Sequence, residues 1–301
     1  MVGLTSEQVE FFETNGYLVL PEALDPSLVA RFGEIVDEWI AMEKGVEQSD
    51  DFFDLKDSHR PDTPRVRCFK CPVRNHPEFD ALARSDTVVG YISPLIGDAM
   101  RLSSVENKIY IKAAEYGAAV EWHQEWAFYP HTNEDLRSIG VVLNDCEEEN
   151  CSLMVTPVSH KGPIYDHHAG HFLCGAIDPD APGIDFSKAV ALTGWQATMT
   201  IHHARTLHSS ALNCSNQPRR LLLIIYAAAD AWPLLSVLDF EEFNSDLVRG
   251  EPDLTSRMTD VPARIPLPSP PMDGSIYERQ RILENRYFEV YGEKASEAAA
   301  E

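Results

Sequence analysis

Two residues with metal-binding side chains stand two positions apart in the middle of the chain, within Trp122–Trp126. On a β-strand such residues project from the same face, so His123 and Glu125 would place an imidazole nitrogen beside a carboxylate oxygen. This pair supplies two ligands of a 2-His-1-carboxylate site, which holds Fe(II) and leaves coordination positions open. Alone the pair is weak evidence, because His-x-Glu also arises by accident on surfaces and in cores.

A second group of residues strengthens this interpretation. His208 supplies another imidazole, and Ser210, two positions later, would share its face. Arg219 follows His208 by eleven residues, a separation at which a hairpin can bring the guanidinium to the neighbouring strand. The planar fork of arginine grips both oxygens of a carboxylate. The spacing therefore favours a metal site next to a binding site for a dicarboxylate.

Three segments resemble the phytanoyl-CoA dioxygenase family of Fe(II)/2-oxoglutarate oxygenases. They are HQEWAFYPHTNEDL (His123–Leu136), SLMVTPVSHKGP (Ser152–Pro163) and HARTLHSSALNCSNQPRRLL (His203–Leu222). The resemblance extends from the N-terminal helices to about residue 235. It implies a mainly β fold with flanking helices, in which the core is a double-stranded β-helix barrel of the jelly-roll or cupin-like kind.

The resemblance implies that His123, Glu125 and His208 are the iron ligands. The family usually has Asp at the position of Glu125, whose extra methylene moves the carboxylate relative to iron. Glutamate is still an acceptable oxygen ligand. Related halogenases have Ala or Gly there, so Glu125 argues against halogenation. His203 competes with His208 as the second histidine, but only His208 has an arginine at the family's spacing.

The resemblance also implies the cosubstrate site. Arg219 matches the arginine that pairs with the distal carboxylate of 2-oxoglutarate, and Ser210 matches its hydrogen-bonding serine. Lys108 falls where the family places a strand residue that lines this pocket. The implied cofactors are Fe(II), 2-oxoglutarate and O2, with ascorbate as a stimulant. The implied reaction releases succinate and CO2 and hydroxylates an unactivated C–H bond, although desaturation, epoxidation or repeated oxidation would use the same residues.

Aromatic residues near the ligands predict a pocket for a small lipophilic substrate, such as a secondary metabolite. They are Trp122, Trp126, Phe128 and Tyr129. The family's name suggests an acyl-CoA instead, but a chain with a net charge of −23 and no dense basic run offers little to hold the phosphates of CoA. The histidine-rich Ser159–His171 predicts a mobile loop at the pocket mouth, with His160 and His131 as neighbours of the bound molecules.

The elements that must position these residues begin with a helical part over about residues 1–100. Thr5 and Gln8 form a capping-box pattern, and Tyr17–Leu20 reads as a strand. Apolar residues spaced by three and four predict an amphipathic helix from Pro26 to Gly45.

Further along the chain, we expect a surface loop over 46–66 and a helix over 77–98. The β-helix core is expected over about 105–230 and a tail over about 231–301, which contains a helix from about 275 to 291. Five apolar or alternating runs predict core strands: Lys108–Lys112, Ile139–Leu143, Leu153–Val158, Ala197–His202 and Leu221–Ala228.

Composition narrows the function classes. The 25 basic and 48 acidic residues argue against a nucleic-acid-binding face, and 44% hydrophobic content argues against wholesale disorder. We expect a single domain over 1–301, as a monomer or homodimer that takes a small-molecule substrate. No apolar run of about 18 residues predicts membrane insertion, and the start lacks a secretory pattern, so a cytoplasmic location is expected. Scattered cysteines, including Cys68 and Cys71, read as reduced thiols rather than a zinc site.

Two other functions remain open from the residues. One is a β-barrel that uses zinc or nickel for hydrolysis, in which Arg219 and Ser210 would have no evident purpose. The other is a catalytically silent relative, in which Glu125 is too long to complete a working site.

Overall fold

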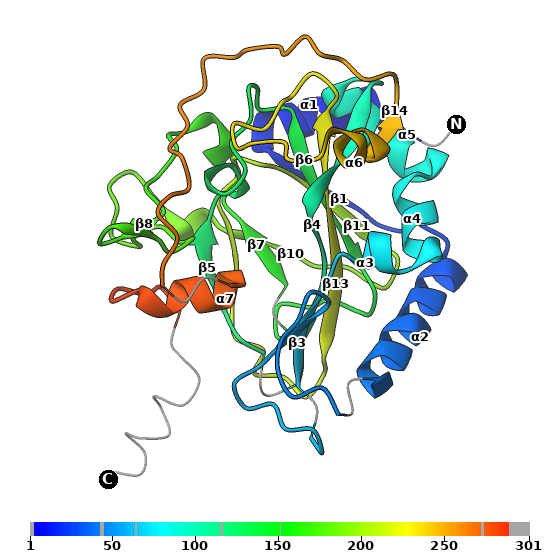
Figure 1. Ribbon diagram of the computed structural model, residues 1–301, viewed down its shortest axis with the longest axis vertical. Coiled ribbons are helices and arrows are strands. Elements are labelled where there is room, and N and C mark those ends of the chain that lie inside the picture. Colours follow the sequence, from blue (N-terminus) through cyan, green and yellow to red (C-terminus); the bar gives the residue numbers. More distant parts are fainter. Residues whose placement is uncertain are drawn as a thin grey trace.

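The computed structural model describes residues 3–42, 45–63, 65–114, 117–150, 152–271 and 274–288. Two β-sheets form its centre (Figure 1). The larger runs in the order β1 (Tyr17–Leu20), β11 (Met199–His203), β6 (Leu136–Val142), β13 (Arg219–Ala228), β4 (Met100–Lys112), β3 (Val66–Lys70) and β2 (Phe53–Leu55), with β14 (Leu247–Arg249) paired to β4. The smaller runs in the order β10 (Val190–Leu192), β7 (Leu153–Val155), β12 (His208–Ser210) and β5 (Val120–His123).

This arrangement confirms the mainly β, jelly-roll architecture, but the word barrel is wrong. Among the residues that the structure describes, no named strand pairs from one sheet to the other. The strands of the smaller sheet have only three or four residues, so they offer few backbone groups with which a ladder could continue. The core is therefore two facing sheets with open edges. A separate hairpin is formed by β8 (His168–Ala169) and β9 (Phe172–Leu173).

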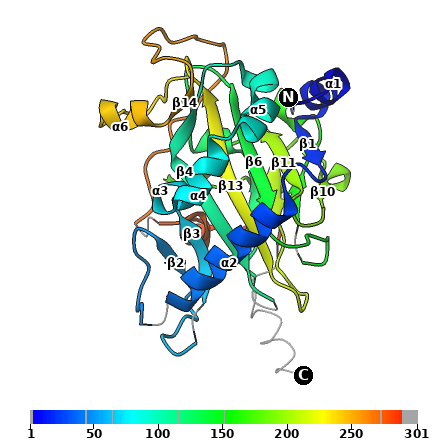
Figure 2. The same ribbon diagram turned by 90° about the vertical axis from the view of Figure 1, so that its right-hand side faces the viewer.

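Helices cover the outer face of the larger sheet (Figure 2). They are α2 (Pro26–Met42), α3 (Pro72–Asn75), α4 (Pro77–Ala83) and α5 (Asp86–Ile96). The predicted amphipathic helix is α2, which buries Val29, Phe32 and Trp39 in the main core. None of the helices in the described segments combines the length and apolarity that a bilayer crossing requires.

The first helix, α1 (Ser6–Asn15), has the expected capping box. Thr5 Oγ1 accepts a hydrogen bond from the Gln8 amide at 3.2 Å, and Gln8 Oε1 accepts one from the Thr5 amide at 2.9 Å. Gly16 ends the helix with φ 79°, and a Cβ there would lie 2.4 Å from His160 Nδ1, so glycine is required by both conformation and space. This turn leads directly into β1.

Three expected elements differ from the structure. The helix over 77–98 is interrupted, because Ser85 caps a new helix by accepting a hydrogen bond from the Val88 amide. The expected loop over 46–66 contains β2, whose buried Phe53 and Leu55 were hidden among polar neighbours. The expected tail helix is only α7 (Ile276–Arg279) followed by the 3-10 turn η4 (Gln280–Ile282), and its last part lies outside the described residues.

All five predicted core strands are present. They correspond to β4, β6, β7, β11 and β13, with bounds shifted by a few residues. The longest ladder joins β13 to β4 along most of their lengths, and β13 also pairs with β6. These strands place a rigid wall opposite the smaller sheet, and the predicted site lies between the two.

Candidate active site

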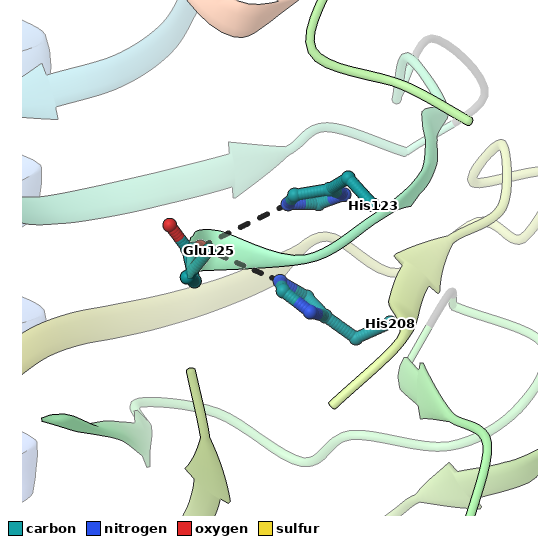
Figure 3. A group of neighbouring side chains, drawn as sticks. All are labelled: His123, Glu125 and His208. Atoms are coloured by element: carbon teal, nitrogen blue, oxygen red, sulfur yellow. Dashed lines mark ion pairs between the residues drawn. The ribbon is translucent and has the colours of Figure 1, made fainter. Parts of the chain in front are cut away.

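The three predicted metal ligands meet between the sheets (Figure 3). His123 ends β5 and His208 begins β12, and the two are direct partners in the antiparallel ladder, with ring centroids 4.0 Å apart. Glu125 Oε1 lies 3.4 Å from His208 Nε2 and 3.8 Å from His123 Nε2. The expectation that Glu125 shares a strand with His123 is wrong, because the strand stops at His123 and Glu125 starts the 3-10 turn η1 (Glu125–Ala127). The turn, rather than strand alternation, directs the Glu125 carboxylate toward His123 and His208.

Backbone carbonyls fix both imidazole rings. His123 Nδ1 lies 2.8 Å from the Glu121 carbonyl oxygen, and His208 Nδ1 lies 3.0 Å from the Thr206 carbonyl oxygen. Because a carbonyl only accepts, each Nδ1 must carry the hydrogen and donate it. Each Nε2 is then left with a lone pair that faces Glu125.

The protonation states also suit metal binding. Burial lowers the pKa of His123, and the neighbouring His208 lowers it further. Burial alone would raise the pKa of Glu125, but hydrogen bonds and charge from the two imidazoles, when their Nε2 atoms are protonated, hold that pKa well below its usual value. A neutral imidazole and an ionised carboxylate are the forms that donate lone pairs to a cation.

The donor set fits Fe(II). One ligand atom from each of the three residues lies within 4.8 Å of the other two. Two ligands that are each about 2.1 Å from one ion are about 3 Å apart at a right angle and about 3.6 Å apart at a wider angle. The spacings of 3.4 and 3.8 Å are close to this range. Two imidazoles and one carboxylate, with the remaining side open to a cavity, are the pattern of non-haem Fe(II) oxygenases.

That cavity has a volume of about 110 Å³ and is lined by residues of both sheets. Arg219 lines it, is 2% exposed and donates from Nη2 to Ser210 Oγ at 2.8 Å. The expectation that a hairpin places Arg219 on the strand next to His208 is wrong. Arg219 begins β13 in the larger sheet, opposite Lys112 of β4, and its side chain reaches Ser210 across the gap between the sheets. The guanidinium and the hydroxyl together form a group that fits a carboxylate.

Lysines of β4 form another part of the cavity wall. Lys108 lines the cavity as expected, while Lys112 is a residue that the sequence interpretation missed. Lys112 is 1% exposed, and its Nζ donates to the Ser210 carbonyl oxygen at 2.9 Å and also to that of Ala211. The alternation of Lys108, Tyr110 and Lys112 on one strand face is the signal that could have revealed it.

Of the four aromatic residues that were expected near the ligands, two line the cavity. Phe128 and Tyr129 line the cavity. Trp122 instead packs against Phe186 with ring centroids 4.7 Å apart, and Trp126 donates from Nε1 to the Pro262 carbonyl oxygen at 2.9 Å. Tyr110 and Tyr277 line the cavity in place of the two tryptophans, and the wall contains more cationic side chains than the sequence interpretation supposed.

The histidine-rich Ser159–His171 includes a rigid support rather than only a mobile loop. His167 is 1% exposed, accepts the Gln124 amide at Nε2 (2.9 Å) and donates from Nδ1 to the Tyr165 carbonyl oxygen (2.8 Å). It thereby holds the backbone between the proposed ligands His123 and Glu125. His160 lies elsewhere, with its ring 5.3 Å from that of His203, and neither lines the cavity.

Comparison with known proteins identifies the family of this chain. The family model of phytanoyl-CoA dioxygenase matches residues 12–221. The chain is 35% identical over 288 residues to the probable alpha-ketoglutarate-dependent hypophosphite dioxygenase of Stutzerimonas stutzeri, covering 94% of this chain and 99% of the relative. It is 30% identical over 165 residues to the L-proline trans-4-hydroxylase of Streptomyces griseoviridis, covering 48% and 61% of the two chains.

The fold has a solved counterpart. EctD from S. alaskensis with 2-oxoglutarate and 5-hydroxyectoine superposes with a TM-score of 0.65 at 20% identity, covering 88% of this chain and 90% of that one. At this identity the likeness concerns the fold, while the family match and the nearly full-length relative concern the activity. The chain belongs to the phytanoyl-CoA dioxygenase family and is an Fe(II)- and 2-oxoglutarate-dependent dioxygenase.

Proposed function

We propose that His123, Glu125 and His208 hold the Fe(II) and that Arg219 and Ser210 bind the distal carboxylate of 2-oxoglutarate, with Lys108 beside it. The observation that carries the proposal is the convergence of two Nε2 atoms and one carboxylate on a cavity that the Arg219–Ser210 pair also lines. A hydrolytic metal ion at this site would leave the Arg219–Ser210 pair without an evident purpose.

When bound, iron and 2-oxoglutarate supply the oxidising chemistry, in which one oxygen atom of O2 enters succinate and the other enters the substrate. The protein's residues bind and orient. The Glu121 and Thr206 carbonyls keep each Nε2 free to ligate. Arg219 neutralises a carboxylate, and because the side chain of Arg219 is only 2% exposed, this ion pair is stronger than one at the surface. Phe128 and Tyr129 exclude water from the reacting face of the cavity.

We propose a small substrate with an anionic oxygen group, and hypophosphite as its first candidate. The relative that matches nearly the whole chain is named as a hypophosphite dioxygenase. The second relative is named as an L-proline hydroxylase, and L-proline carries a carboxylate. The cavity itself supports an anion, because four of its lining residues are cationic: Lys108, Lys112, Arg219 and Arg279. Oxidation of hypophosphite to phosphite inserts one oxygen atom into a P–H bond, which balances one O2 and one 2-oxoglutarate.

The lipophilic substrate expected from the sequence is the second candidate, and Phe128 and Tyr129 are the residues that favour it. An acyl-CoA fits least, since a chain with a net charge of −23 offers little to hold the phosphates of CoA. The proposal keeps a cytoplasmic location.

The test is a turnover panel with Fe(II), 2-oxoglutarate and O2, in which hypophosphite, L-proline and a fatty acid are compared by succinate release and product analysis. We expect hypophosphite to increase succinate release and to yield phosphite in equal amount. Stimulation by the fatty acid alone would contradict the anionic substrate. Wild-type rates in the Glu125→Ala variant would discard the proposed ligand set.

A further inference from the structure

A second, larger cavity adjoins the one that contains the proposed iron ligands. It has a volume of about 600 Å³, and its walls include Arg101, His131, Leu235, Val237 and Pro266. Three residues line both cavities: Phe128, Tyr129 and Arg279. The two spaces therefore meet at these side chains, and Arg279 is the charged one. We call the larger space the outer cavity and the other the inner cavity.

The helix that carries Arg279 is docked from one side by Arg67 of β3. Arg67 is 5% exposed, donates from Nη1 to Ser275 Oγ at 3.2 Å and stacks over the ring of Tyr277 at 4.9 Å. Glu278 lies 3.9 Å from the same guanidinium and completes a capping box with Ser275. These contacts hold α7 against the larger sheet, directly before Arg279.

The residue that follows Arg279 is anchored from the other side. Gln280 is 3% exposed, accepts the Glu121 amide at Oε1 (3.2 Å) and donates from Nε2 to the Gly175 carbonyl oxygen (3.0 Å). Figure 1 shows α7 beside β5, the strand that ends at His123. Contacts on both sides of Arg279 thus hold its backbone in place at the junction of the two cavities.

The cations that line the cavities are Lys108, Lys112 and Arg219 in the inner one, Arg74 and Arg101 in the outer one, and Arg279 in both. Deeper in the inner cavity, Arg219 donates to Ser210, and Lys112 donates to the Ser210 carbonyl. In the outer cavity, the Asp239 carboxylate accepts the Glu242 amide at 2.9 Å, and Glu242 itself pairs with Arg74. These two acidic groups therefore oppose an incoming anion less than isolated carboxylates would.

We propose that Arg279 binds the anionic group of the substrate and that the outer cavity is the route by which the substrate reaches the iron. This inference rests on the proposed function and adds the residue that determines substrate specificity. Arg279 lies outside residues 12–221, the part that matches the family model, which is where a determinant of the individual substrate is expected to differ. The anion recognised is a small oxyanion or carboxylate, for which a guanidinium offers two parallel donors.

The experiment measures hypophosphite binding by calorimetry without O2, to the full chain with Fe(II) and saturating 2-oxoglutarate, so that no turnover occurs. Loss of a charge-assisted hydrogen bond in Arg279→Gln is expected to weaken hypophosphite binding by about 10- to 100-fold. Arg279→Lys keeps the charge and is expected to recover part of that affinity. The dissociation constant of 2-oxoglutarate, measured separately, should change by less than about 3-fold.

Arg281→Gln is the matched control, because Arg281 lies two residues further, pairs with Asp57 and does not line either cavity. It should bind hypophosphite like the wild type. A parallel titration with L-proline distinguishes a carboxylate from a phosphorus oxyanion as the bound group. Weaker binding of either anion in Arg279→Gln alone supports the proposal. Equal binding in the variant, equal loss in Arg281→Gln, or binding of neither anion by the wild type overturns it.

Failure of the proposed function gives a different result. If the wild type releases no succinate from 2-oxoglutarate with Fe(II) and O2, the dioxygenase assignment of these residues fails, whatever the calorimetry shows. If succinate is released but hypophosphite and L-proline bind equally well to Arg279→Gln, only the role of Arg279 fails.

Discussion

The inner cavity has two sides that are built in different ways. On the side of the smaller sheet, His123 and His208 are ladder partners, and backbone carbonyls fix both rings. On another side, α7 and the turn after it have only a few residues and are held by side chains, chiefly Arg67, Glu121 and Gln280. The first side lies within the family match and the second lies beyond it.

This difference suggests a division of labour. A position defined by a β-ladder changes little when surface residues change, which suits ligands that must keep one geometry. A short segment held by side chains can change its residues without disturbing the sheets, which suits recognition of a particular substrate. We therefore expect substitutions on the ladder side to affect iron, substitution of Arg219 in the facing sheet to affect 2-oxoglutarate, and substitutions in the C-terminal segment to affect the substrate.

The largest effect is expected from His208→Ala. Loss of residues that merely support metal ligands costs about 10- to 100-fold in affinity or activity, so removal of a ligand should lower succinate release by more than about 100-fold. Iron content after dialysis should fall with it. His171→Ala, which removes an exposed histidine, is the control and should retain both. Retention of iron and activity by His208→Ala would break the assignment of the ladder side.

Next in size is Arg219→Gln. Without the guanidinium, the distal carboxylate of 2-oxoglutarate loses charge-assisted hydrogen bonds, so KM for 2-oxoglutarate should rise by about 10- to 100-fold. Steady-state kinetics at saturating O2 measure this. Arg220→Gln is the neighbouring control, because Arg220 pairs with Asp37 of α2 on the other face of the sheet. A similar rise in both variants would mean that loss of sheet stability, not of a ligand contact, is the cause.

The buried His167 on the ladder side should make the free energy of unfolding depend on pH. Burial lowers the pKa of His167 from 6.5 to about 3, so the folded protein keeps this ring neutral. Below pH 6.5 the unfolded chain gains a proton that the folded chain does not, so stability falls as the pH falls. Between pH 7 and pH 5 this costs about 2 kcal/mol.

The variant His167→Gln keeps an acceptor for the Gln124 amide and has no titration. Chemical denaturation at pH 7 and pH 5 should therefore show a smaller loss of unfolding free energy in the variant, by about 2 kcal/mol. An identical pH dependence in both proteins would show that His167 is already protonated when folded, and that its bond to Gln124 is not maintained.

A smaller effect, in the C-terminal segment, is expected from Glu121→Gln in β5, which contacts that segment. The Glu121 carboxylate accepts the amides of Tyr287 at 3.0 Å and Phe288 at 3.3 Å. Replacing it with a neutral amide weakens bonds to a charged acceptor by about 1 kcal/mol, so local opening should increase by about 5-fold. Hydrogen exchange of these two amides measures it, with the exposed Glu284→Gln as control. No change in exchange would mean that other contacts hold the segment.

The sequence predicted the ladder side better than the C-terminal side for a physical reason. Strand alternation and the spacing of His208 from Arg219 are local patterns, so His123, Glu125 and the core strands could be identified in advance. Even there the reasoning about geometry failed in detail, since Glu125 lies on a turn and Arg219 lies in the facing sheet.

The remaining residues could not be identified in this way because their partners are distant in sequence. Gln280 meets Glu121 across 159 positions, and Arg67 meets Ser275 across 208. Such contacts leave no periodicity in either segment, so Arg279 had no local signal that placed it at the cavity. His167 was hidden differently: its histidine-rich surroundings resemble a polar loop, and only its burial reveals the support it gives to Gln124.

The separate roles of Arg219 and Arg279 are tested most directly by two dissociation constants, those of 2-oxoglutarate and of hypophosphite. Both are measured without O2, in Arg219→Gln and in Arg279→Gln. The account predicts that Arg219→Gln weakens 2-oxoglutarate binding and Arg279→Gln weakens hypophosphite binding at saturating 2-oxoglutarate, each by about 10-fold or more. If both variants weakened the two ligands to the same extent, the two arginines would not hold different anions, and the account would be contradicted.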